Sequence, residues 1–87
     1  MREQTMTATP LERAIGLTIQ DLANDRGISH KEIQERAGIH DKTFRRYFTA
    51  FDRHIPMEEL EKVASVLGVT PSEIAALAEE RLNRSGK

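Results

Sequence analysis

The chain has 87 residues, of which 31% are charged and 38% hydrophobic, and it contains no cysteine. A chain this short folds as one small domain, so we expect a compact helical bundle rather than two lobes around a deep active-site cleft. The lack of cysteine excludes disulfides, thiolate metal sites and cysteine nucleophiles, and it fits a reducing cytoplasm.

Apolar residues are too dispersed for a membrane protein. No apolar run approaches the roughly 20 residues that a membrane span needs, so no membrane partner is expected. The opening stretch MREQTMTATP lacks an apolar core, so it is not expected to be a signal peptide.

Charge is unevenly distributed along the chain, although the formal net charge is only −1. Residues 40–55 hold four basic and two acidic residues, whereas residues 56–87 hold four basic and six acidic ones. The net charge counts against a nucleic-acid partner, but the distribution predicts one basic and one acidic end.

The first helix is predicted over about 10–26, after a flexible tail at residues 1–9. Thr9 is a typical N-cap, Pro10 suits the first helical position, and Glu12 can complete a capping box. Gly27 then ends the helix. One domain is expected over 10–83, followed by a second flexible tail at 84–87.

The next two helices are short and joined by a tight turn. Ser29 and Glu32 predict another capping box, and Gly38 ends the second helix. The third helix should begin near His40 or Asp41. Its aromatic residues recur at helical spacing and predict one buried face rather than a base-stacking platform: Phe44, Tyr47, Phe48 and Phe51.

Two more helices complete the pattern. Pro56 opens the fourth and Gly68 ends it, and Thr70 with Glu73 gives a further capping box for the fifth. The fifth helix has a predicted buried face of Ile74, Leu77, Ala78 and Leu82. No alternating pattern indicates a strand, so the fold class is all-α with five helices.

A tight glycine-containing turn at residues 38–39 favours helix-turn-helix geometry. Residues 29–48, SHKEIQERAGIHDKTFRRYF, followed by LEKVASVLGVTPSEI, resemble the Xre/Cro-type helix-turn-helix family of phage repressors and bacterial regulators. The resemblance spans roughly residues 11–78 and implies a lambda-repressor-like domain. Two positions depart from the family: Gln34 stands where a small residue is usual, and His30 where Gln often binds a phosphate.

The face of the third helix opposite its aromatic residues is cationic. A 100° step per residue places Lys42, Arg46, Thr49 and Arg53 on it, with Asp41 and Arg45 on one flank and Thr43 on the other. Arg53 and His54 are expected in the loop after this helix, where the resemblance implies contact with the phosphate backbone. Such side chains read guanine and bind phosphates. The family resemblance implies base contacts early and midway along this helix. The complete set of candidate DNA-binding residues is His30, His40, Asp41, Lys42, Thr43, Arg45, Arg46, Thr49 and Arg53.

Several of these residues have a second interpretation. Asp41 either caps the helix and pairs with Arg45 or accepts a hydrogen bond from cytosine. His40 is a cap, a phosphate contact or a plain exposed histidine. Arg2 could reach a minor groove, although a loose tail is favoured. The three histidines are 10 and 14 residues apart, so no metal site is expected.

No catalytic residues are predicted, because no nucleophile lies beside a base and no glycine-rich phosphate loop is present. No enzyme activity, cofactor or small-molecule ligand is expected. The sequence predicts a sequence-specific regulator that binds a double-stranded DNA operator, a repressor of phage-immunity or Cro-like type acting by promoter occlusion. The resemblance implies a homodimer, and the sequence leaves open a weak dimer or a monomer that pairs on DNA. The expected location is the bacterial cytoplasm, in association with the nucleoid. The alternatives are an antitoxin and another protein-binding helical module.

Overall fold

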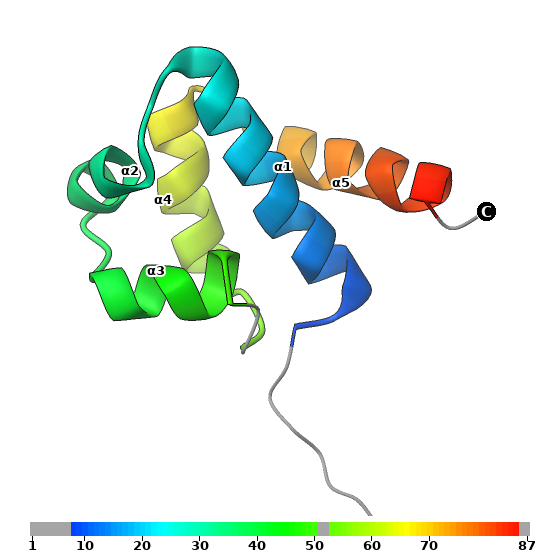
Figure 1. Cartoon of the computed structure of the whole chain (residues 1–87), viewed down its shortest axis with the longest axis horizontal. Helices are drawn as coiled ribbons and strands as arrows, with labels where there is room; N and C mark the ends of the chain where they lie inside the picture. Colours follow the sequence, from blue (N-terminus) through cyan, green and yellow to red (C-terminus); the bar gives the residue numbers. More distant parts are fainter. Residues whose placement is uncertain (1–7, 51–52, 86–87) are drawn as a thin grey trace, which may run out of the picture.

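Five helices make up the described part of the chain, which comprises residues 8–50 and 53–85 of the computed structural model (Figure 1). They are α1 (Pro10–Arg26), α2 (His30–Ala37), α3 (Asp41–Phe48), α4 (Met57–Leu67) and α5 (Pro71–Ser85). The all-α, five-helix prediction is confirmed. The predictions for Arg2, for Phe51 and for most of the N-terminal tail fall outside the described residues.

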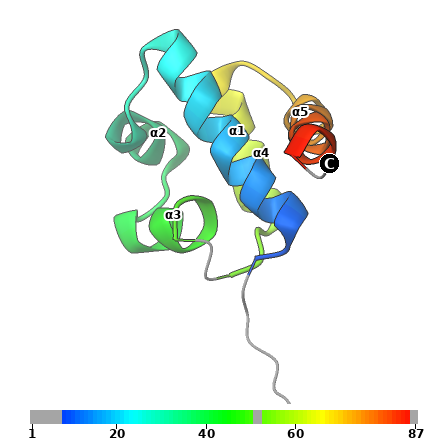
Figure 2. The ribbon, with the colours of Figure 1, turned by 45° about the vertical axis from the view of Figure 1, so that its right-hand side comes forward.

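The helices are arranged around a central pair. α1 and α4 lie in the middle, α2 and α3 lie on one side of them, and α5 lies on the other (Figure 2). Each helix contributes apolar side chains to one shared core, and the largest fully buried ones are Phe44, Phe48, Ile19, Ile33, Ile74 and Val63. This arrangement leaves α2 and α3 together at one edge of the molecule.

The turn between α2 and α3 depends on a left-handed glycine. Gly38 has φ +71°, which a residue with a Cβ adopts only with strain, and its N–H donates to the carbonyls of Gln34 and Glu35. The next residue, Ile39, is buried in the core. The turn is therefore short and anchored, which fixes α3 relative to α2.

Two of the three predicted capping boxes are confirmed. In the boxes of α1 and α5, the threonine hydroxyl accepts from the glutamate N–H and the glutamate carboxylate accepts from the threonine N–H. At α2 only half of the predicted box forms. Ser29 accepts from the Glu32 N–H, but the Glu32 carboxylate lies 3.5 Å from Arg36 instead. An arginine one turn on competes successfully for that carboxylate.

Two predictions about α5 need correction. Leu77 was expected in the buried face, but 41% of its surface is exposed, because Ile74 and Ala78 are the residues that face the core. The helix also continues to Ser85, two residues past the predicted boundary at 83. No helix in residues 8–50 and 53–85 is both long and apolar enough to cross a bilayer.

Candidate nucleic-acid interface

α3 is anchored by aromatic side chains on one face. Phe44 and Phe48 are almost fully buried, and their ring centroids lie 5.0 Å apart. Tyr47 is half-buried and meets Phe48 edge-on at 6.1 Å. The interpretation of these three side chains as a core stripe is confirmed, and it fixes the direction of the opposite face.

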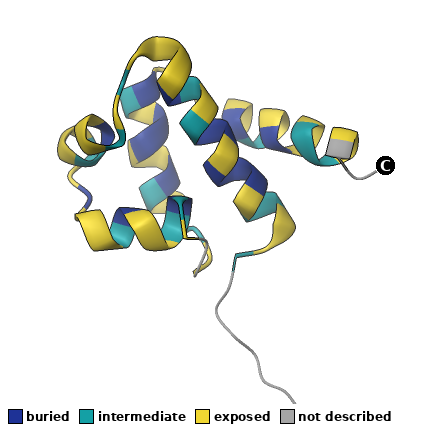
Figure 3. Cartoon of the chain, in the orientation of Figure 1, coloured by how far each residue is buried: buried dark blue, intermediate teal, exposed yellow. Residues whose placement is uncertain are grey.

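The opposite face of α3 is charged and exposed, as burial along the helix shows (Figure 3). Asp41 and Arg45 are paired at 3.8 Å, which is one of the two interpretations left open for Asp41. Lys42 and Arg46 form no ion pair with another residue in the described part of the chain. They are one helical turn apart, about 6 Å along the axis. The outward face therefore presents the unpaired cations Lys42 and Arg46 beside Arg45, which is paired with Asp41.

The prediction that this stripe continues along the helix to Thr49 is wrong, because α3 ends at Phe48. Thr49 has the non-helical angles φ −128° and ψ −42°. Its N–H and hydroxyl both donate to the Arg45 carbonyl, as does the Ala50 N–H. Thr49 is thus a half-buried C-cap, and Arg53 lies exposed in the connection to α4.

His40 is the N-cap of α3. Its Nδ1 accepts a hydrogen bond of 3.2 Å from the Lys42 N–H, so of the three interpretations given for His40 the structure shows the cap. Asp41 follows in the first turn, where a negative charge is favourable to the helix dipole. These two residues therefore stabilise the N-terminal end of α3.

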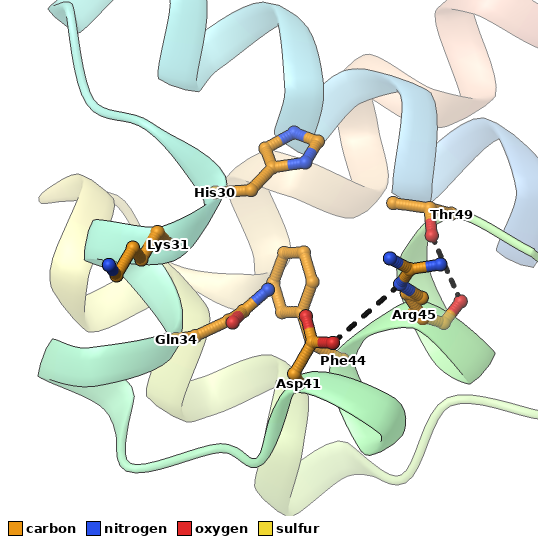
Figure 4. A pocket seen from close by; sticks show the side chains of 7 residues that line it. All are labelled: His30, Lys31, Gln34, Asp41, Phe44, Arg45 and Thr49. Carbon is orange, nitrogen blue, oxygen red and sulfur yellow. Dashed lines mark hydrogen bonds and ion pairs between the residues drawn. The ribbon is translucent and has the colours of Figure 1, made fainter.

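An open hollow of about 600 Å³ lies between α2 and α3 (Figure 4). His30 enters it with its ring 5.5 Å from that of Phe44, and Gln34 lines it from the next turn of α2. Lys31 also lines the hollow, and the sequence analysis missed it. Lys31 could have been predicted, because it follows His30 at the start of the first motif helix. The remaining lining residues are Asp41, Phe44, Arg45 and Thr49.

Two residues of α1 hold α3 and the connection behind it, and the sequence predicted neither role. Gln20 donates through Nε2 to the Phe48 carbonyl at 3.4 Å, at the C-terminal end of α3. Glu12 accepts from the Ile55 N–H at 2.6 Å and lies 2.8 Å from His54 Nδ1. Both contacts join segments at least 28 residues apart, for which a single sequence carries no local signal.

The carboxylate of Glu12 has a pKa below its ordinary value. Burial acts to raise the pKa, but hydrogen bonds from the Thr9 N–H, His54 and the Ile55 N–H together outweigh it by stabilising the charged form. Glu12 is consequently held as a carboxylate at neutral pH, which keeps its acceptor oxygens available to both segments.

The described residues contain an anchored helix with a cationic outer face, joined by a glycine turn to a second helix of the same length. Residues 18–80 match the family of Cro/C1-type HTH DNA-binding domains. The chain belongs to this family. The matched span of this Cro/C1-type domain includes all of α2, α3 and α4. No curated protein matches the chain.

Membership of the Cro/C1-type family confirms the Xre/Cro-type resemblance predicted from the sequence. It also confirms the predicted lambda-repressor-like fold. The family is one of DNA-binding regulators and not of enzymes. Within the described residues of this Cro/C1-type domain, no group of three or more histidine and acidic side chains is placed to hold a metal ion.

Proposed function

We propose that this Cro/C1-type domain is a sequence-specific regulator that binds double-stranded DNA with α3 in the major groove. The observation that carries the proposal is the exposed pair Lys42 and Arg46, opposite the buried Phe44 and Phe48. An anchored helix with cations on its free face matches the way in which recognition helices meet base edges.

The candidate residues divide by chemistry. Arg46 and Lys42 suit guanine O6 and N7, and Arg45 with Asp41 forms a neighbouring pair whose acid can accept from cytosine. Thr43 is half-buried beside this face. His30, His40, Thr49 and Arg53 lie at the ends of α2 and α3 or behind α3, where phosphate contacts are expected.

Repression by promoter occlusion is the mechanism that we propose, of the phage-immunity or Cro-like type. A protein seated in the major groove at a promoter sterically excludes the polymerase, which requires no further contact. Most acidic side chains of α4 and α5, among them Glu61 and Glu80, are exposed and reduce non-specific attraction to DNA elsewhere on the surface.

Binding as a homodimer on paired half-sites is part of the proposal. Leu17 on α1 and Leu77 on α5 are 40% and 41% exposed, and each lines a hollow that also includes Arg81. Asp25 and Arg84 line the hollow at Leu77, so it carries side chains of opposite charge beside the leucine. A second copy related by two-fold symmetry can pair such a surface with itself.

The test is a DNA-binding titration at two salt concentrations, using operator sequence recovered by selection from a random library. The Lys42→Ala/Arg46→Ala double variant should lose about 2–5 kcal/mol of site binding and show a shallower salt dependence. The matched control is Arg26→Ala/Lys62→Ala, which removes the same charge from exposed positions on α1 and α4. No DNA affinity of the unchanged protein at about 50 mM salt would refute the proposal.

An antitoxin or another protein-binding module is the second candidate, and the same exposed Leu17 and Leu77 favour it. That function predicts that the Lys42→Ala/Arg46→Ala variant keeps its activity. A Leu17→Ser/Leu77→Ser variant would lose it, but the same loss follows if these leucines pair two copies on DNA, so the α3 variant is the one that separates the two functions.

A further inference from the structure

One carboxylate joins the start of α1 to the connection between α3 and α4. Glu12 Oε1 accepts from the Thr9 N–H at 2.8 Å and lies 2.8 Å from His54 Nδ1. Oε2 accepts from the Ile55 N–H at 2.6 Å. Only 16% of the Glu12 side chain is exposed, so water competes weakly for these contacts.

These contacts fix the connection between α3 and α4 from its far side. Ile55 also packs against the core, whereas Arg53, two residues earlier, is exposed. At the near side, Gln20 holds the Phe48 carbonyl at the end of α3. Glu12 and Gln20 are eight residues apart on α1, about 12 Å along its axis. Hydrogen bonds from α1 therefore hold the connection at both of its ends, at Phe48 through Gln20 and at Ile55 through Glu12.

We propose that Glu12 is a positioning residue for DNA binding, which holds the segment carrying Arg53 in a fixed place behind α3. The inference rests on the proposed function, in which Arg53 contacts a phosphate. A cation on a fixed segment binds a phosphate without first paying the entropy of ordering that segment, so loosening the segment weakens the contact although Arg53 itself is unchanged.

The chain contains its own control for this proposal. Glu73 forms a capping box with Thr70 at 2.8 and 3.0 Å, closely matching the 2.8 and 3.2 Å of Glu12 with Thr9. Glu73 is exposed, and among residues 8–50 and 53–85 it makes no hydrogen bond or ion pair with a distant segment such as the α3–α4 connection. Glu73→Gln therefore removes a capping carboxylate alone, whereas Glu12→Gln removes the capping carboxylate and the tie to His54 and Ile55.

The experiment measures operator affinity and its salt dependence for Glu12→Gln, Glu73→Gln, Arg53→Ala and the Glu12→Gln/Arg53→Ala double variant. Circular dichroism sets a temperature at which every variant is folded, and amide hydrogen exchange follows the Ile55 N–H. Glu12→Gln should weaken binding, lower the salt slope by up to about 0.9, as for one lost phosphate, and speed exchange at Ile55. Glu73→Gln should do none of these.

The double variant decides whether Glu12 acts through Arg53. We expect it to bind no more weakly than Arg53→Ala alone, within the roughly twofold scatter of independent sites. The inference is overturned if the affinity losses of the two single variants multiply in the double variant. It is also overturned if Arg53→Ala binds DNA normally, or if Glu12→Gln and Glu73→Gln lose the same affinity.

If Glu12→Gln does not fold, His54→Ala takes its place in the same comparison, because it removes one contact of the tie at a half-exposed side chain. The same lack of additivity with Arg53→Ala is expected, and additive effects again count against the inference. Failure of the unchanged protein to bind DNA refutes the proposed function instead, so the two failures are distinguishable.

Discussion

The motif Thr-Pro-X-Glu occurs twice in this chain, as TPLE at residues 9–12 and as TPSE at residues 70–73. Both copies begin a helix with a proline at its first position and form the same pair of capping hydrogen bonds. They differ in what surrounds the glutamate. Glu73 is exposed, whereas Glu12 also meets His54 and Ile55 from the connection that follows α3.

The difference shows how one local motif acquires a second role. Capping needs only residues within one turn, so both copies provide it wherever the helix lies. The additional role of Glu12 depends on the path of the chain, which returns beside the start of α1 some 42 residues later. We expect perturbations of the two motifs to separate these contributions.

The largest effect is expected from replacing the two glutamates. Glu12→Gln should lower the free energy of unfolding by about 2 kcal/mol more than Glu73→Gln, because hydrogen bonds to a charged group contribute about 1.5–3 kcal/mol and Glu12 has the further donors. Chemical denaturation of both variants measures this. Equal losses would mean that the contacts with His54 and Ile55 contribute nothing measurable to stability.

A smaller and equal effect is expected from the two threonines. Thr9→Ala and Thr70→Ala should each lower the free energy of unfolding by about 1 kcal/mol, because each removes one N-cap hydroxyl and leaves the glutamate in place. The same denaturation experiment applies. A markedly larger loss for Thr9→Ala would show that the cap of α1 also orders Glu12 for its distant contacts.

The smallest effect is a difference in acid sensitivity. The pKa of Glu12 is lowered in the folded protein from its ordinary 4.5, so its stabilisation is fully present above about pH 4.5 and is lost as the pH falls through the folded value. The stability difference between the unchanged protein and Glu12→Gln should therefore shrink on acidification below pH 4.5. Thermal unfolding from pH 7 to pH 3 measures it, and a constant difference would contradict the assignment.

Much of the recognition helix was predictable because its signals are periodic. The spacing of Phe44, Tyr47 and Phe48 predicted the anchored face, and its opposite gave Lys42 and Arg46. The same reasoning failed at Thr49, because it extended the helix past Phe48. Periodicity does not show where a helix ends when no glycine follows, and here three donors converge on the Arg45 carbonyl instead.

The prediction that Leu77 of α5 is buried failed for a similar reason. Leu77 fits the apolar spacing of the buried face, yet it lies at the edge where that face leaves the core. Its position depends on how α5 rotates against α1, which no spacing rule specifies. Whether Leu77 faces solvent or a second copy bears directly on the proposed homodimer.

The sequence alone determined the five helices, most of their boundaries, the glycine turn at Gly38 and the capping boxes at Thr9 and Thr70, because all of these depend on residues within a few positions of one another. The tertiary structure decided that Glu12 and Gln20 hold the two ends of the connection behind α3. Such contacts join residues 28 to 43 positions apart, and they exist only once the core has brought those segments together.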